Sequence, residues 1–187
     1  MGRHKQHKKK KGLERKTPIL NGVNAFVSKR KMTENATELL EKAAILLQTG
    51  RADAALPFAE RVLELASSNS ANILLALNLI GEINVELGEI DSAREAFLRA
   101  VEIDPEGTIA ETQDGGAEKY LWLAQLSEVG GVDSVSWFEK GVAGLRRVIQ
   151  FLEQSNDLGS SVLLEEKKKK LAGALCAVVE IYMTDLS

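Results

Sequence analysis

A pattern of small and large apolar residues recurs along this chain, and its clearest copy spans residues 74–105. The spacing is that of two helices that pack against each other, with small residues at their contact and large residues beside it. The residues that carry the pattern are Leu77, Ile80, Gly81, Asn84, Ala93, Phe97, Ala100 and Pro105. We expect Gly81 and Ala93 to face each other where the two helices are closest. Leu77 and Phe97 are expected to fill the space on either side.

Three other segments share parts of this pattern. An upstream copy, offset by 38 residues, consists of Leu39, Ala43, Gly50, Ala55, Ala59 and Leu63. A downstream copy consists of Tyr120, Leu123, Ala124, Gly130, Gly131, Ser134, Phe138 and Gly141. The last segment has the apolar face of another first helix, and we expect its apolar residues in the core: Leu171, Leu175, Val178, Val179, Tyr182 and Leu186.

No partner helix follows this last apolar face before the final residue, Ser187. A repeat array normally ends in a helix whose outer face is polar. We therefore expect either that the sequence is the N-terminal part of a longer protein, truncated at its C-terminus, or that another chain covers this end.

Helical periodicity continues from residue 34 onward, without the sustained alternation or the hairpin turns that indicate strands. Gly50 and Gly88 lie at short turns that need a positive φ. Asp91 is expected to cap the helix that follows the second turn. The predicted helices cover residues 35–49, 52–67, 70–87, 90–103, 116–129, 133–154 and 161–186.

The copy at residues 74–105 resembles the tetratricopeptide repeat, which has a large apolar residue, Leu-Gly, an aromatic residue, a small residue, Phe and Pro at these intervals. Ile80-Gly81 stands at the Leu-Gly position, and Asn84 replaces the aromatic residue. The resemblance implies an all-α superhelical solenoid of about three and a half repeats. The first helix of each pair would line its concave face.

Charge divides the chain into two parts. Residues 1–31 contain eleven basic residues and one acidic residue, a net charge of +10, whereas the remaining residues carry a net charge of −13. We expect a disordered basic tail at residues 1–33 and a tetratricopeptide-repeat domain at residues 34–187. Six residues of the tail form a candidate nuclear localisation signal: Arg3, Lys5, Lys8, Lys9, Lys10 and Lys11. A tail that only aids solubility is the other interpretation.

Residues that could support catalysis or bind a metal are few. His4 and His7 lie in the predicted tail, and Cys176 lies on the predicted apolar face of the last helix with no histidine in the repeat domain to activate it. The charged run at residues 165–170 is expected to be a solvated helix face. No apolar stretch reaches the length of a membrane span. The sequence therefore predicts a protein of the cytoplasm and nucleus that is not an enzyme and has no cofactor, metal or membrane partner.

The repeat register predicts which side chains face the concave surface. These are Asn78, Glu82, Glu86, Glu118, Gln125, Glu128 and Glu180. This lining is acidic, so it does not suit the acidic peptides that some tetratricopeptide clamps bind through Lys and Arg. It would attract a basic ligand and accelerate its association. The alternative is that these glutamates are ordinary solvated helix surface.

A closer resemblance lies in the segments 115–126, 137–141 and 180–187, which read Gly-Gly-Ala-Glu-Lys-Tyr-Leu-Trp-Leu-Ala-Gln-Leu, Trp-Phe-Glu-Lys-Gly and Glu-Ile-Tyr-Met-Thr-Asp-Leu-Ser. They are similar to the fungal family of dedicated assembly chaperones of large-subunit ribosomal protein four. The resemblance implies a partner that is a newly made basic ribosomal protein, bound at a long internal loop. It also implies delivery of this client to nuclear pre-ribosomes.

We therefore expect a dedicated chaperone that holds a basic, extended client segment in an acidic groove, with a nuclear import receptor as a further partner of the tail. A tetratricopeptide adaptor for another multiprotein complex is the first alternative. The second alternative is an RNA-associated scaffold whose basic tail contacts phosphates. The tail holds one aromatic residue, Phe26, so we expect no specific nucleic-acid partner.

Overall fold

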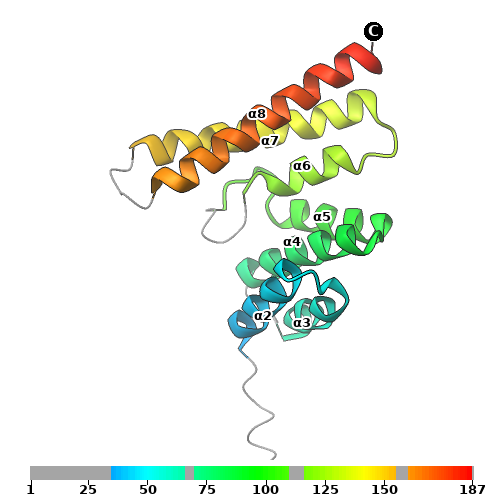
Figure 1. The fold of residues 1–187 in the computed structure, drawn as a ribbon, viewed down its shortest axis with the longest axis vertical. Coiled ribbons are helices and arrows are strands. Elements are labelled where there is room, and N and C mark those ends of the chain that lie inside the picture. Colours follow the sequence, from blue (N-terminus) through cyan, green and yellow to red (C-terminus); the bar gives the residue numbers. More distant parts are fainter. Residues whose placement is uncertain (1–34, 66–69, 110–115, 155–159, 187) are drawn as a thin grey trace, which may run out of the picture. The chain divides into compact units, whose positions relative to one another are not determined.

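The computed structural model describes residues 35–65, 70–109, 116–154 and 160–186, and within these ranges it contains seven α-helices and no strand. Figure 1 shows them in chain order. The helices are α2 (Ala36–Gln48), α3 (Ala52–Leu65), α4 (Ser70–Leu87), α5 (Ile90–Ile103), α6 (Glu118–Gln125), α7 (Gly131–Gln154) and α8 (Ser160–Thr184).

Six of the seven predicted helices agree with the structure to within two residues at each end, and α6 is the exception. It ends at Gln125 rather than at residue 129. The Ser127 side chain accepts a hydrogen bond from the Gly130 backbone N–H (3.1 Å) and donates one to Asp133 (2.6 Å). These bonds stabilise a turn where the sequence predicts a further helical turn. Helix α6 is therefore shorter than the stretch of helical periodicity in the sequence.

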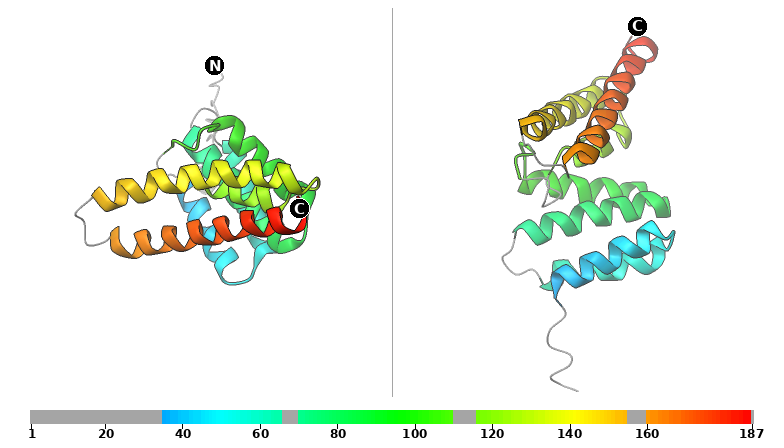
Figure 2. Two further views of the ribbon diagram at one scale, coloured as in Figure 1. Left: turned by 90° about the horizontal axis from the view of Figure 1, so that it is seen from above. Right: turned by 60° about the vertical axis from the view of Figure 1, so that its left-hand side comes forward.

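The helices pack as successive hairpins. α2 packs on α3, α4 on α5 and α6 on α7, while α8 packs on α7 (Figures 1 and 2). The second helix of each pair also contacts the first helix of the next, through α3 with α4 and α5 with α6. Three pairs and one further helix confirm the all-α tetratricopeptide solenoid of about three and a half repeats.

The turns between helices follow the sequence in most details. Gly50 and Gly88 have φ angles of 72° and 76°, as predicted. The prediction that Asp91 caps α5 was wrong. Asp91 is the second residue of α5, which begins at Ile90, and no side chain caps the N-terminus of this helix. Asp91 lies in the first turn of α5, where a negative charge interacts favourably with the helix dipole.

Small residues allow the helices of each pair to approach closely. A Cβ atom added to Gly81 would lie 2.4 Å from the ring of Phe97, which is buried. The side chain nearest to Gly81 is therefore Phe97, while the predicted approach of Gly81 to Ala93 stays a prediction. The Phe97 ring also stacks on Trp122, with centroids 6.0 Å apart, and so links the second repeat to the third.

The last helix is only partly buried. Its residues Ala174, Ala177, Val178 and Ile181 pack against α6 and α7. The prediction that the whole apolar face lies in the core was wrong for the residues that are exposed: Leu175, Val179, Tyr182 and Leu186. Cys176 is exposed as well. The physical reason is that α8 packs on one side only, and no element of the described ranges covers the other side.

Residues 1–34 lie outside the described residues, and with them the predicted tail, its localisation signal, His4 and His7. The predicted boundary between a tail at 1–33 and a repeat domain at 34–187 stays a prediction. No helix in the described part of the chain combines the length and the apolar character needed to cross a membrane.

Substitution of Gly81 tests the close packing of α4 on α5. We expect Gly81→Ala to lower the free energy of unfolding by about 1–3 kcal/mol, because the methyl group would overlap the buried Phe97 ring. Urea unfolding followed by circular dichroism measures the change. Gly173→Ala is the matched control, because its methyl group would meet no atom within 4 Å. The free energy of unfolding of the control is expected to rise by about 0.5–1 kcal/mol, because alanine favours a helix interior more than glycine does. Equal midpoints for the two variants would contradict the proposed packing.

Candidate functional site: a groove along the first helices

A groove with a cavity of about 450 Å³ runs along the first helices of the repeats. Its lining comes from α2, α4, α6 and α8, with Phe97 of α5 at its floor. The apolar part of the lining is Leu40, Ala44, Leu75, Leu79, Phe97 and Trp122. The polar part is Thr37, Glu41, Gln48, Asn78, Glu82, Glu118, Lys119 and Lys167. The groove thus combines an apolar floor with charged edges.

The structure brings together some of the residues that the sequence predicts for the concave face. Asn78, Glu82 and Glu118 line this groove, and Gln125 lines a second cavity beside it. The remaining three, Glu86, Glu128 and Glu180, are exposed and line neither cavity. Glu128 follows the early end of α6 and forms an ion pair with Arg94 of α5.

Sequence reasoning missed the contribution of α2. The lining residues of α4 are Leu75, Asn78, Leu79 and Glu82, and those of α2 include Thr37, Leu40, Glu41 and Ala44. Each residue of the second set lies 38 residues before its counterpart, which is the offset between the two copies in the sequence. Projecting this offset from the predicted positions Asn78, Glu82 and Glu86 would have found Leu40, Ala44 and Gln48, which line the groove, but not Glu41, whose counterpart is Leu79.

Two lysines of α8 reach the groove and pair with Glu118. Lys167 Nζ lies 3.0 Å from Glu118 Oε1, and Lys170 donates to the same oxygen. The prediction of a solvated face for residues 165–170 was wrong for Lys167, which is 7% exposed. The sequence pattern does not reveal that α8 turns these lysines toward α6.

Electrostatics around Glu118 favour the ionised pair. Burial raises the pKa of Glu118, but hydrogen bonds and positive charge from Lys170 and Lys167 outweigh it, so the pKa lies below its usual range. Burial lowers the pKa of Lys170, but its bonds to Glu118 and Glu166 raise it above its usual range. The pair therefore stays charged at neutral pH, and it joins α8 to α6 across the groove.

A buried ion pair joins α6 to the residue that follows α5, and its lysine, Lys119, also lines the groove. Lys119 Nζ lies 2.7 Å from Asp104 Oδ2, and both side chains are at most 2% exposed. Asp104 Oδ1 also accepts a hydrogen bond from the Thr108 backbone N–H (2.9 Å). Burial lowers the pKa of Lys119, although Asp104 acts in the opposite direction. Asp104 offsets the charge of Lys119, so this lysine adds little positive potential to the groove.

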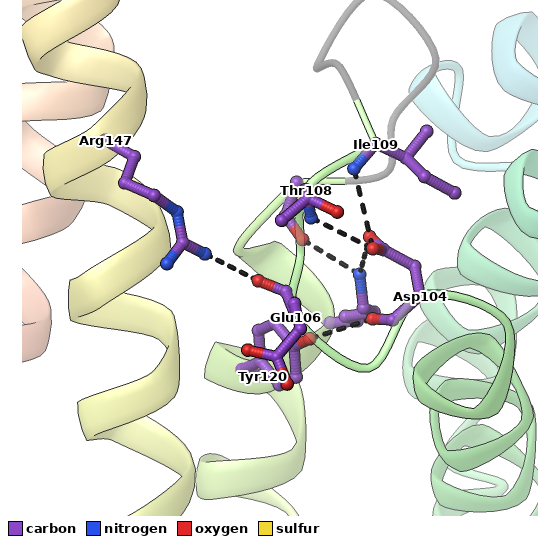
Figure 3. Close-up of polar contacts among 8 residues, drawn as sticks. Asp104, Glu106, Thr108, Ile109, Tyr120 and Arg147 are labelled. Atoms are coloured by element: carbon purple, nitrogen blue, oxygen red, sulfur yellow. Dashed lines mark hydrogen bonds and ion pairs between the residues drawn. The ribbon is translucent and has the colours of Figure 1, made fainter.

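Two further hydrogen bonds attach the segment that follows α5 to the third repeat. The Tyr120 hydroxyl donates to the Asp104 carbonyl oxygen (2.9 Å), and Arg147 of α7 donates to the Glu106 carbonyl oxygen (2.5 Å) (Figure 3). The segment after α5 is therefore attached to α6 and α7 at several points. These contacts fix the place of α6, and hence of Glu118 and Trp122, relative to the second repeat.

The arrangement is suited to binding. Glutamates lie on α2, α4 and α6, while the lysines that line the two cavities come from α6 and α8. Among the described residues, no group of three or more His, Cys, Asp or Glu is placed to hold a metal ion. The acidic α2–α4 part of the groove can pair with cations of an extended peptide, and the apolar floor can cover its aliphatic stems.

Comparison with known proteins supports the repeat fold. The family model of the tetratricopeptide repeat matches residues 34–106. The "Probable assembly chaperone of rpl4" of Emericella nidulans is 58% identical over 150 residues, which cover 80% of this chain and 39% of that protein. Over four fifths of its length this chain is similar to part of an assembly chaperone of rpl4, and it is built from tetratricopeptide repeats. The resemblance noted in the sequence is confirmed.

Two further proteins support the relationship. The protein of the same name in Schizosaccharomyces pombe is 38% identical over 111 residues, which cover 59% of this chain and 29% of that protein. The solved structure "Assembly Chaperone of RpL4 (Acl4) (Residues 1-338)" superposes with a TM-score of 0.74 at 44% identity, and covers 82% of this chain and 56% of that one. The chain spans about two fifths of the length of the Emericella relative.

Removal of one hydroxyl group tests the support of α6. Burial, together with the charges of Asp104 and Glu106, raises the pKa of Tyr120 from 10.0 to about 12. The unfolded chain releases this proton near pH 10, whereas the folded protein keeps it, so folding stability falls as pH rises from 10 toward 12. The Tyr120→Phe variant does not show this fall in folding stability at high pH. At pH 7 it is about 1 kcal/mol less stable than wild type, because the hydrogen bond to the Asp104 carbonyl oxygen is missing.

Urea unfolding of both proteins between neutral pH and pH 11 measures the two effects. The stability difference between wild type and Tyr120→Phe is expected to shrink above pH 10. A difference that stays constant over this range would show that the phenol does not titrate as described.

Proposed function

We propose that this chain is a dedicated chaperone of ribosomal protein four of the large subunit. It binds a basic, extended segment of the newly made protein, keeps the protein soluble and delivers it to nuclear pre-ribosomes. The observation that carries the proposal is the 58% identity to the Emericella relative over 80% of this chain. The mechanism is stoichiometric binding, without a catalytic step.

Charge supports a basic client. Residues 32–187 carry a net charge of −13, which attracts a cationic segment and increases the rate of encounter. Glu41 and Glu82 place negative charge beside the apolar floor of the groove. A bound lysine or arginine would pair with these carboxylates while its aliphatic part covers Leu40 or Leu79. Such binding would keep the client's cations from RNA before assembly.

The predicted site residues take different parts in this mechanism. Asn78, Glu82 and Glu118 line the groove and would face the bound segment, and Gln125 would face its continuation in the second cavity. The exposed Glu86 and Glu180 would act at longer range through the electric field that guides the client. The basic tail would act separately, as a nuclear localisation signal that an import receptor binds.

Capture of partners tests the function itself. Purified chain is immobilised and exposed to fungal extract at physiological salt. The proposal expects one dominant basic protein, the large-subunit ribosomal protein four. Recovery of a multi-subunit complex without this protein would overturn the proposal and favour an adaptor.

Neutralisation of the groove tests the electrostatic mechanism. We expect Glu41→Gln with Glu82→Gln to weaken binding of purified rpl4 about three- to tenfold, mainly by lowering the association rate. The effect should shrink between about 50 mM and 150 mM salt, because the Debye length shortens. Surface plasmon resonance measures both rates. The matched control is Glu60→Gln with Glu95→Gln, which removes equal charge from exposed positions on α3 and α5 outside the groove.

Equal effects of the two double variants would show that net charge, and not the groove, attracts the client. Unchanged binding by both variants would overturn the electrostatic mechanism.

Removal of the tail separates its role from that of the repeats. A chain that lacks residues 1–31 is expected to bind rpl4 as the full chain does, because the groove is intact. Fused to a fluorescent protein, it is expected to lose nuclear accumulation. Retained nuclear accumulation would contradict the localisation signal. Loss of client binding together with loss of RNA binding would instead favour the RNA-associated scaffold.

A further inference from the structure

A second cavity of about 330 Å³ lies between α6, α7 and α8. Its walls are formed mainly by Leu121, Trp122, Phe138, Gly173, Ala174 and Ala177. Phe138 and Ala174 are buried and form its floor, while Gly173 is exposed at its mouth. The cavity is therefore an apolar hollow that opens to solvent.

The glycine at its mouth differs from the other glycines inside the described helices. A Cβ atom added to Gly81, Gly141 or Gly144 would lie 2.4–2.9 Å from a neighbouring side chain, so these glycines serve close packing. A Cβ atom added to Gly173 would meet nothing within 4 Å. Glycine weakens a helix interior, and here no packing contact explains it. Because residue 173 has no side chain, the mouth of the hollow is unobstructed at this position.

The hollow continues the groove described above. Glu118 and Trp122 line both cavities, so a chain lying in the groove can pass directly from one to the other. The charge changes along this path. Glu41 and Glu82 place negative charge on α2 and α4, whereas at the hollow Lys167 and Lys170 add positive charge beside Glu118. The hollow is therefore less attractive to a cation, and its apolar walls favour an apolar side chain.

We propose that the hollow between α6 and α8 receives an apolar side chain of the same basic segment that the groove binds. This inference rests on the proposed function. Neighbouring helices lie roughly 10 Å apart, which an extended chain crosses in about three residues. The client's apolar residue thus lies roughly four to six residues from the cations that face Glu41 and Glu82. The client is selected by this combination and not by positive charge alone.

Filling the hollow tests the proposal. Gly173→Leu places a side chain in the open space and is expected to weaken binding about tenfold or more, the effect of excluding one buried apolar side chain. Gly173→Ala makes a similar change in helix propensity while leaving most of the hollow empty, and should bind as wild type does. Ala172→Leu adds a leucine at the adjacent exposed position, outside the hollow, and should also bind normally.

The probes are overlapping 15-residue peptides that tile the rpl4 protein of Emericella nidulans, with binding to the 187-residue chain measured by fluorescence anisotropy. In the peptide that binds best, each apolar residue is replaced by alanine in turn. One replacement is expected to weaken binding to wild type about tenfold and to have no further effect on Gly173→Leu. This non-additivity would place that side chain in the hollow.

The other outcomes are distinguishable. If no peptide and no intact rpl4 binds to any of the proteins, the proposed function fails. If peptides bind and Gly173→Leu binds them as wild type does, the hollow is not part of the site and only this inference fails. If Gly173→Leu abolishes a dimer seen by light scattering in wild type and leaves peptide binding unchanged, a second copy occupies the hollow, which also overturns the inference.

Discussion

The buried ion pair between Asp104 and Lys119 is the most deeply buried polar contact among those that hold the third repeat on the second. Both charges are removed from water, so the pair costs desolvation energy that its attraction offsets only in a good geometry. Removal of one partner from such a pair typically costs about 3–5 kcal/mol, because the other charge remains buried. Any arrangement of the third repeat that separates Asp104 from Lys119 without exposing them to water would carry this cost. Glu118 and Trp122 belong to the same helix as Lys119, so the groove is complete only in the arrangement that keeps the pair together.

The lysines of α8 change how the acidic character of the groove should be understood. Lys167 and Lys170 occupy the Glu118 carboxylate, and their charge reduces the local negative potential. A cation of a ligand would have to compete with them at this point. Charge along the groove is therefore graded rather than uniform. A graded groove can fix the direction and register of an extended ligand, which a uniformly acidic surface cannot do.

Much of the fold follows from the spacing of small and large apolar residues. That spacing predicts the helix pairs, the turns at Gly50 and Gly88, and the groove positions of Asn78 and Glu82. The spacing does not predict side-chain positions that depend on contacts between segments far apart in the sequence. Neither the pairing of α8 lysines with Glu118 nor the Asp104–Lys119 bond leaves a periodic signal. The exposure of Tyr182 and Cys176 likewise depends on which elements pack on α8, and a single helix pattern carries no information on that.

Glycine has two opposite uses in these helices, and together they link packing to binding. At Gly81 and Gly141 the missing side chain lets a neighbouring ring or leucine approach, and the contact offsets the conformational entropy that glycine loses. At Gly173 no such contact exists, so the helix has a weaker residue without a gain in packing. A large side chain at position 173 would instead fill the adjoining hollow. The proposed binding therefore requires only a small residue at position 173, whereas close packing requires glycine itself at Gly81 and Gly141.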